Sequence, residues 1–207
     1  MLSLSKSLIE EKNTKHGVMT FGRMNPPTTG HMKVIDKIKT LAAKYKTTGH
    51  VIVSHSNDPK KNPLTSTQKI KHLKRYLKRY APSMQVSSSS KEHPSILHAA
   101  ANFHKKGVEH LHVVVGSDRV EEMKKLLNSY NGKKSQHGEY NFKKITVHSS
   151  GNRDPDSEGT EGMSASKMRE HASNNDFRSF RAGVPSRVSD THAKELFKEV
   201  RSGMGHK

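Results

Sequence analysis

The sequence contains a short polar turn whose residues are suited to binding phosphate. It runs from Gly22 to His31 (GRMNPPTTGH) and leads directly into a predicted helix, with Thr28 or Thr29 as the cap. The N–H groups and the dipole at a helix N-terminus attract an anion and disfavour an imidazolium. We therefore predict that His31 is neutral and donates a hydrogen bond to a phosphate oxygen, with Gly30 allowing close approach. The simpler alternative is a capped helix with an incidental histidine.

A second phosphate-binding pattern lies near the C-terminus, at Ser164–Arg169 (SASKMR). Ser164 is suited to capping a helix whose first turn presents N–H groups. Ser166, Lys167 and Arg169 add a hydroxyl and two fixed cations, so the segment could neutralise a triphosphate. Taken alone, the same residues also fit a capped surface helix.

Two more segments place polar residues after apolar runs. Gly116 and Asp118 follow the most apolar run of the chain, and Asp118 fits a ligand contact and a helix cap equally well. In the segment 60–69 (KKNPLTSTQK), Lys61 could reach a phosphate, although a solvated lysine is the simpler interpretation. Thr65 in the same segment is suited to capping the next helix.

The elements between these segments predict the fold that positions them. Short apolar runs rich in β-branched residues predict five strands; these are Gly17–Phe21, His50–Ser54, Met84–Val86, Leu111–Val115 and Lys144–Val147. Apolar residues at helical spacing lie between them, at Met32–Leu41, Ile70–Leu77, Ile96–Phe103 and Val120–Leu127. This alternation predicts an α/β, Rossmann-like parallel sheet of about five strands with flanking helices, which binds its ligand at the carboxyl ends of the strands.

Three parts of the chain are expected. They are an N-terminal extension at 1–15, a Rossmann-like core at 16–163 and a helical C-terminal part at 164–207 that carries the SxSKxR motif. Three further segments are predicted to lack regular structure; these are 87–90, 128–140 and 149–162, the last of which is polar and rich in glycine and proline.

Composition narrows the classes of partner. The 207 residues include 37 Lys and Arg against 19 Asp and Glu, so the formal net charge is +18 with histidines neutral, and the mean hydropathy is −0.87. Such a charge attracts nucleotides or nucleic acid. Aromatic residues are only 5% and tryptophan is absent, so platforms for stacking single strands are scarce.

Other classes are excluded or disfavoured by composition. No apolar run approaches the ~18 residues of a membrane span, and the absence of cysteine excludes a disulfide scaffold. Residues 1–16 include acids and lack a long apolar core, so no leader peptide is expected and a cytoplasmic location is favoured. Histidine pairs such as His50/His55, His93/His98 and His110/His112 lack carboxylate partners at ligand spacing, so no protein-ligated metal is predicted.

Taken in order, the polar segments resemble the nucleotidyltransferase superfamily with the H/T-x-G-H signature. Thr28–His31 matches TxGH, and 22–27 (GRMNPP) is similar to the GRFQPxH stretch of archaeal-type nicotinamide-mononucleotide adenylyltransferases. Asn62–Thr65 followed by Lys69 resembles their NPFTxxER segment, and Gly116–Asp118 resembles the family's GxD.

The C-terminal segments resemble two branches of the superfamily. Ser164–Arg169 is similar to the ISSTxIR motif that holds the β- and γ-phosphates, whereas Thr160–Gly162 resembles the RTEGISTS motif of cytidylyltransferases. Gly183–Val188 is similar to the GxVPxxV tail of the archaeal-type members. The resemblance covers roughly 17–188 and is greatest to phage-encoded members, for which the location is the host cytoplasm or the virion.

The resemblance implies transfer of a nucleoside monophosphate, AMP favoured, from a triphosphate to a phosphorylated acceptor such as nicotinamide mononucleotide, with release of pyrophosphate. The enzymatic alternative is a cytidylyltransferase acting on a phosphorylated alcohol or sugar. An alternative of another class is a basic nucleic-acid-binding or virion-associated protein on the same scaffold. The implied partners are ATP or CTP and a small phosphorylated acceptor, with non-specific nucleic-acid contact through the basic surface, no membrane, and an oligomer of unspecified size.

The resemblance also implies roles for individual residues. The catalytic residues are Thr28, His31, Lys167 and Arg169. The nucleotide-binding residues are Gly22, Arg23, Asn25, Gly30, Gly116, Asp118, Ser164 and Ser166. Contacts to the acceptor or to phosphate are expected from Lys61, Asn62 and Lys69. Mg²⁺ is expected to bridge the triphosphate and to be held mostly by water.

Overall fold

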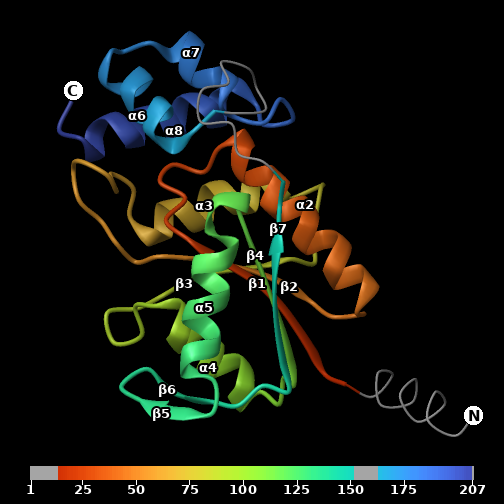
Figure 1. The fold of residues 1–207 in the computed structure, drawn as a ribbon. Coiled ribbons are helices and arrows are strands. Elements are labelled where there is room, and N and C mark those ends of the chain that lie inside the picture. The colour runs from red at the N-terminus through yellow and green to blue at the C-terminus, as the bar shows by residue number, and fades with distance from the viewer. Residues whose placement is uncertain (1–13, 152–162, 207) are drawn as a thin grey trace, which may run out of the picture.

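A five-stranded parallel sheet forms the centre of the computed structural model, which describes residues 14–151 and 163–206. The strand order is β3-β2-β1-β4-β7, with bounds Gln85–Ser88, Gly49–Val53, His16–Gly22, His110–Val115 and Lys144–Ser149. The chain begins in the middle with β1, adds β2 and β3 on one side, and then crosses to β4 and β7 on the other (Figure 1). The predicted Rossmann-like class is confirmed, and the topological switch point lies between β1 and β4.

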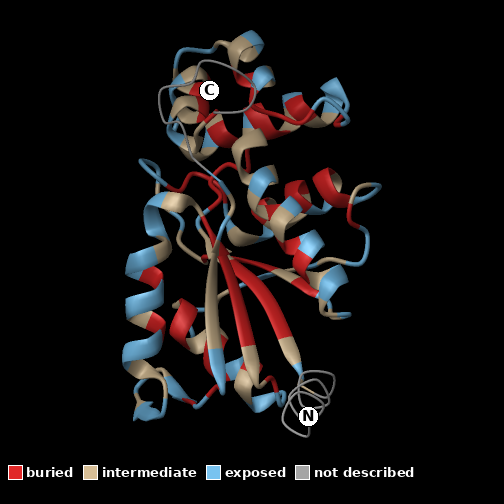
Figure 2. Ribbon diagram, turned by 45° about the vertical axis from the view of Figure 1, so that its right-hand side comes forward, coloured by how far each residue is buried: buried red, intermediate tan, exposed pale blue. Residues whose placement is uncertain are grey.

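Helices cover both faces of the sheet. Helices α2 (Thr29–Lys44) and α3 (Ser66–Leu77) pack on one face, and α4 (Ile96–Lys105) and α5 (Val120–Tyr130) on the other (Figure 1). Strands covered on both sides need apolar residues at successive positions. In β1, Val18 belongs to the cluster around α2 and α3, and Met19 to the cluster around α4 and α5. Figure 2 shows the result, with buried central strands and exposed outer helix faces.

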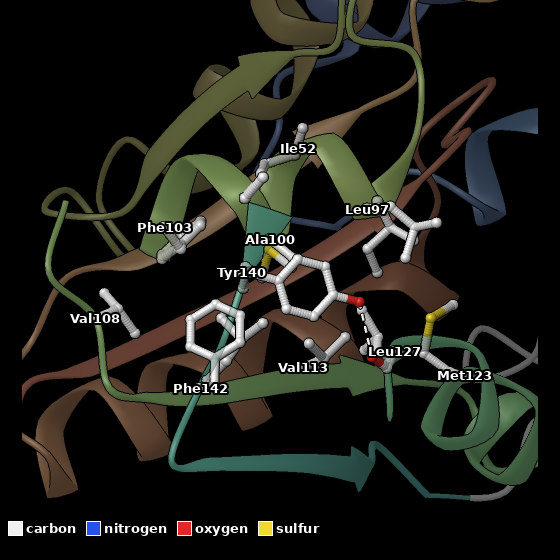
Figure 3. Packing of buried hydrophobic residues seen from close by; sticks show 14 of the residues in the cluster. Ile52, Leu97, Ala100, Phe103, Val108, Val113, Met123, Leu127, Tyr140 and Phe142 are labelled. Atoms are coloured by element: carbon white, nitrogen blue, oxygen red, sulfur yellow. Dashed lines mark hydrogen bonds between the residues drawn. The ribbon is translucent and has the colours of Figure 1, made fainter. Parts of the chain in front are cut away.

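The region 128–140 is more regular than predicted. It holds the end of α5 and a hairpin of two short strands, β5 (Lys133–Ser135) and β6 (Gly138–Tyr140). Tyr140 is buried and its hydroxyl donates to the carbonyl of Leu127 at 2.7 Å, beside Phe142 (Figure 3). Strands of three residues are too short for a periodic pattern, so the prediction of a loop was wrong.

The serine run at 87–90 also departs from the prediction. Ser87 and Ser88 continue β3 and pair with Ile52 and Val53. Because β3 is the edge strand of the sheet and its residues are largely exposed, polar side chains are compatible with strand structure there.

The C-terminal part is helical, as predicted. Helices α6 (Ala165–Ser173), α7 (Phe177–Ala182) and α8 (Asp190–Gly203) lie beyond the carboxyl ends of the strands (Figure 1). They share a core around Phe180 and Leu196, to which Leu64 and Tyr76 of the preceding part contribute. No helix of the described ranges is long and apolar enough to cross a membrane.

Ion pairs attach α8 to α3. Lys71 lies 2.7 Å from Glu195 and also pairs with Glu199, while Arg75 lies 2.6 Å from Glu195. The imidazole of the buried His72 lies 2.7 Å from the carboxylate of Glu199. Hydrogen bonds from Lys71 and then from Arg75 lower the pKa of Glu195 to about 2. Helix α8 is therefore attached to α3 by ion pairs, in addition to its apolar contacts in the C-terminal core.

We expect this network to weaken in acid. The pKa of Glu195 is lowered on folding from an ordinary value near 4.5, so its contribution is present above pH 4.5 and is lost as the pH falls toward 2. Because Glu195 is partly exposed, Glu195→Gln should lower the free energy of unfolding at pH 7 by only ~1 kcal/mol or less. Urea unfolding from pH 7 to pH 3 should show the difference shrinking, and a constant difference would contradict the account.

Candidate functional site

A cavity of about 220 Å³ lies at the carboxyl ends of β1 and β4, beside the N-termini of α2 and α6. This is the position in which open α/β sheets bind their ligands. Ten of the predicted site residues line it, namely Gly22, Arg23, Asn25, Thr28, Gly30, His31, Lys61, Gly116, Ser166 and Arg169. The structure thus brings together residues from all four of the polar segments.

The first turn fixes the tautomer of His31. Thr28 is the N-cap of α2, as predicted, and its backbone N–H donates to His31 Nδ1 at 3.0 Å. The Thr28 hydroxyl lies 3.1 Å from the same nitrogen. A nitrogen that accepts a hydrogen bond carries no proton, so the ring is neutral and its proton is on Nε2. The ring can therefore offer an N–H donor in the cavity, which is the form predicted from the sequence.

The N-terminus of α2 is also linked to the C-terminal part. The N–H of Thr29 donates to the carbonyl of Gly183 at 2.9 Å, so this N–H is directed to protein rather than to a ligand. A side chain at position 183 would place a Cβ 2.1 Å from the sulfur of Met168. The glycine of the GVPSRV segment is thus required by close packing.

Arg169 supplies a positioned cation. Its Nη1 donates to the carbonyl of Asn25 at 2.8 Å, and its Nη2 donates to the hydroxyl of Ser166 at 3.1 Å. Burial and then the charge of Arg23 lower the pKa of Arg169, while Asp58 opposes the shift. Two guanidinium groups that repel one another beside a cavity are stabilised by a bound anion.

Two basic residues of the cavity were not predicted from the sequence. Lys33 in the first turn of α2 and Arg119 after the Gly116–Asp118 segment both line it. With Arg23, Lys61 and Arg169 they make five basic residues beside His31, and no acidic residue of the described chain lines the cavity. The position of Arg119, next to a segment already identified, was the one signal in the sequence that could have indicated it.

Asp118 and the C-terminal pair Ser164 and Lys167 do not line the cavity. Asp118 is exposed in the short 3-10 helix η1 (Ser117–Arg119), and Arg119 rather than Asp118 is the N-cap of α5. A Cβ at Gly116 would lie 2.7 Å from a carboxylate oxygen of Asp118, so glycine allows this turn. Ser164 caps α6 as predicted and accepts from the N–H of Lys167 at 3.1 Å.

Asn62 and Lys69 are used inside the protein. Asn62 is buried and its amide donates to Asp58, which shapes the loop that carries Lys61. Lys69 is 0% exposed, and its ammonium donates to the carbonyl of Ser54. Burial lowers the pKa of Lys69 to about 8. In this structure both side chains bond to neighbouring loops and do not line the cavity. This differs from the expected contact with acceptor or phosphate.

Asn25 connects three segments of the site. Its side chain is 1% exposed, donates to the carbonyl of Leu64 and accepts from the N–H of Leu64, both at 2.9 Å. Its backbone carbonyl accepts from Arg169. The two hydrogen bonds to Leu64 give Asn25 a structural role, and its role in nucleotide binding stays a prediction.

A second and larger cavity adjoins the first. It has a volume of about 680 Å³ and shares Phe21 with the cavity around His31. Its lining combines serines at the end of β3 and just after it, three histidines and residues of α4; among them are Ser88, Ser90, His93, His98, Asn102, Lys105 and His137. Thr160–Gly162 and residues 1–13 of the predicted extension lie outside the described residues.

Replacing Asn25 tests its structural role. Asn25→Ala should lower the free energy of unfolding by about 2–4 kcal/mol, because it leaves the buried N–H and carbonyl of Leu64 without partners at ~1–3 kcal/mol each. Asn128→Ala, which removes an exposed amide that bonds within α5, should change it by less than ~0.5 kcal/mol. Urea unfolding measures both, and equal small effects would contradict the role assigned to Asn25.

Comparison with known proteins gives a consistent result. The fold is similar to that of a bifunctional NMN adenylyltransferase/ADP ribose pyrophosphatase from Francisella tularensis, with a TM-score of 0.56 and 11% sequence identity. The match covers 93% of this chain and 53% of that one, so the chain spans about half the length of that protein. A sequence search of curated proteins finds no match. The family model described as cytidylyltransferase-like matches residues 19–171. The chain therefore belongs to the cytidylyltransferase-like family, as its polar segments predicted.

Proposed function

We propose that the protein transfers AMP from ATP to a small phosphorylated acceptor and releases pyrophosphate. The observation that carries the proposal is the cavity at the switch point, where an imidazole N–H and five basic residues converge without an acidic residue of the described chain. This lining suits a polyanion such as a triphosphate. Family membership supports the general reaction, nucleotidyl transfer. The choice of ATP and of the acceptor goes beyond it and is our proposal.

No protein nucleophile is needed for this reaction. An oxygen of the acceptor phosphate attacks the α-phosphorus of ATP, a new P–O–P bond forms, and the bond to the β-phosphate breaks as pyrophosphate leaves in line. The acceptor phosphate is already ionised, so positioning and charge stabilisation supply the catalysis. His31 Nε2–H would stabilise charge on the α- and β-phosphates, and Arg169 with Ser166 would hold the departing pyrophosphate.

The lining also indicates how Mg²⁺ would be held. The described residues of the cavity offer no carboxylate, so phosphate oxygens and water would be the ligands of the ion. Mg²⁺ bound in this way supplies additional neutralisation of the triphosphate. The side chains that orient the triphosphate are then the basic residues and hydroxyls named above.

The second cavity is suited to the body of the acceptor. It adjoins the cavity of His31 at Phe21, and its volume of about 680 Å³ is in the range of sites for small molecules. Serine hydroxyls and three histidines give it hydrogen-bonding groups, and Lys105 adds a cation. A nucleoside monophosphate such as nicotinamide mononucleotide is one acceptor that combines polar groups with a planar ring.

Transfer of CMP to a phosphorylated alcohol or sugar is the second candidate. The matching family model is cytidylyltransferase-like, and Thr160–Gly162 resemble a cytidylyltransferase motif. The turn at 22–27 and the segment Gly183–Val188 resemble adenylyltransferases, and the similar fold from Francisella tularensis includes an NMN adenylyltransferase. We therefore favour ATP and test both nucleotides.

Replacing His31 tests the proposed reaction. Pyrophosphate release is measured with Mg²⁺, with ATP or CTP, and with nicotinamide mononucleotide, phosphopantetheine, flavin mononucleotide, phosphocholine and glycerol phosphate. We expect release with ATP and one acceptor, and His31→Ala should lower turnover ~10²–10³-fold, the scale for loss of one key donor. His206→Ala, at an exposed position near the C-terminus, is the matched control and should keep full turnover.

The outcomes separate the alternatives. Release with CTP alone would support the cytidylyltransferase. Unchanged turnover of His31→Ala would contradict the assigned site. No release with any pair, together with nucleic-acid binding that falls steeply as salt increases, would support the basic binding protein instead.

Replacing Arg169 separates binding of triphosphate from binding of acceptor. Arg169→Ala should raise the KM for the nucleoside triphosphate at least ~10-fold, since a charge-assisted contact is worth ~1.5–3 kcal/mol, and should change the KM for the acceptor much less. Arg169→Lys keeps the charge but loses the two-pronged geometry, so it should recover only part of the loss. Equal increases in both KM values would refute this placement of Arg169.

A further inference from the structure

Three histidines gather on one face of the sheet, at the amino ends of β1 and β4. His16 pairs with His110 in the strand register, and His112 follows two residues later on the same face of β4. One nitrogen from each of the three rings lies within 4.8 Å of the others. Tyr45, at the end of α2, stacks on His16 and on His112, with ring centroids 4.2 and 4.3 Å apart.

Two of these rings meet through their nitrogens. His16 Nδ1 and His112 Nε2 are 2.9 Å apart, so one proton is shared between them. A metal ion can take the place of such a proton, because neutral imidazole nitrogens are metal ligands once their protons are displaced. His110 stacks on His112 with ring centroids 3.9 Å apart, and one of its nitrogens lies within 4.8 Å of a nitrogen of each of the other two rings.

The outer nitrogens of the group have partners of their own. His112 Nδ1 lies 2.9 Å from His148 Nε2, and His110 Nε2 lies 2.9 Å from the hydroxyl of Thr146. Histidines that bind metal are oriented in this way, with the second ring nitrogen held by a neighbouring group. Both partners come from β7, the next strand of the sheet.

We propose that His16, His110 and His112 form a binding site for a divalent transition metal of the Zn²⁺ type. Three imidazoles without a carboxylate select such ions over Mg²⁺ or Ca²⁺, and a water would complete a tetrahedral set. Positive charge from Lys144 acts on His110, and that from Lys37 and Lys44 on His148, so the coordinate bonds would have to outweigh the repulsion of a cation. No such site was predicted from the sequence, because His110 and His112 lack a carboxylate partner at ligand spacing; the structure adds His16 from the neighbouring strand.

The place of the site indicates a structural role. His16 begins β1 and Gly22 ends it, so six residues of extended chain, roughly 20 Å, separate the metal from the cavity of His31. A bound ion would join the amino ends of β1 and β4. The proposal therefore stands apart from the proposed transferase activity and is tested without it.

The test uses the full chain without an affinity tag, stripped of metal with a chelator and then dialysed. Titration calorimetry with ZnCl₂ should show one ion bound per chain, and MgCl₂ should show no binding to the protein alone. Co²⁺ should give visible absorption typical of tetrahedral nitrogen ligation. Zn²⁺ at 100 times its Kd should raise the melting temperature by about 5–10 °C.

Variants locate the ion. His16→Gln should weaken Zn²⁺ binding by more than ~100-fold, and His148→Asn, which removes only an outer partner, by ~10–100-fold. His98→Asn is the control, because it alters the separate group of His93, His98 and His137. The Co²⁺ absorption spectrum of the unaltered chain reports the ligands of the ion directly, so this test does not require any variant to fold. Absence of stoichiometric binding, unchanged binding by His16→Gln, or loss of binding in His98→Asn would overturn the proposal.

Discussion

The site depends on one buried amide. The side chain of Asn25 donates to the carbonyl of Leu64 and accepts from its N–H, and the backbone carbonyl of Asn25 accepts from the guanidinium of Arg169. These contacts hold together the turn after β1, the loop after β2 and the first turns of α6. Because the turn is fixed, Thr28 can direct its N–H at Nδ1 of His31, and a network satisfied in this way specifies one arrangement.

The excess of basic over acidic side chains in the described lining of the cavity is the second property of the site. The cations of the chain are paired where they attach α8 to α3, through Lys71 and Arg75. Around the cavity Arg23 instead repels Arg169, and the described lining has no carboxylate. Holding such charges together costs stability, which a bound polyanion would restore. This basic lining is the physical basis for the proposal that the cavity binds a triphosphate.

The sheet could be predicted from the sequence because buried parallel strands require uninterrupted apolar runs, such as Leu111–Val115. The helix caps Thr28 and Ser164 could be predicted from residue type and position, whereas the site roles expected of His31 and Arg169 came from the resemblance of their segments to a known family. The burial of Lys69 could not, since it depends on where α3 meets the end of β2. For the same reason the contribution of Lys33 was missed, because which cations share a cavity is decided by packing between distant segments.

The protonation state of His31 is the most direct test of the account. Long-range ¹H–¹⁵N correlation spectra of the imidazole distinguish the two neutral tautomers and the imidazolium. At pH 7 the account predicts an unprotonated Nδ1 and a protonated Nε2, with the Nε2 signal shifting when a non-hydrolysable ATP analogue is added. A protonated Nδ1, or no response of Nε2 at saturating analogue, would contradict the assigned site.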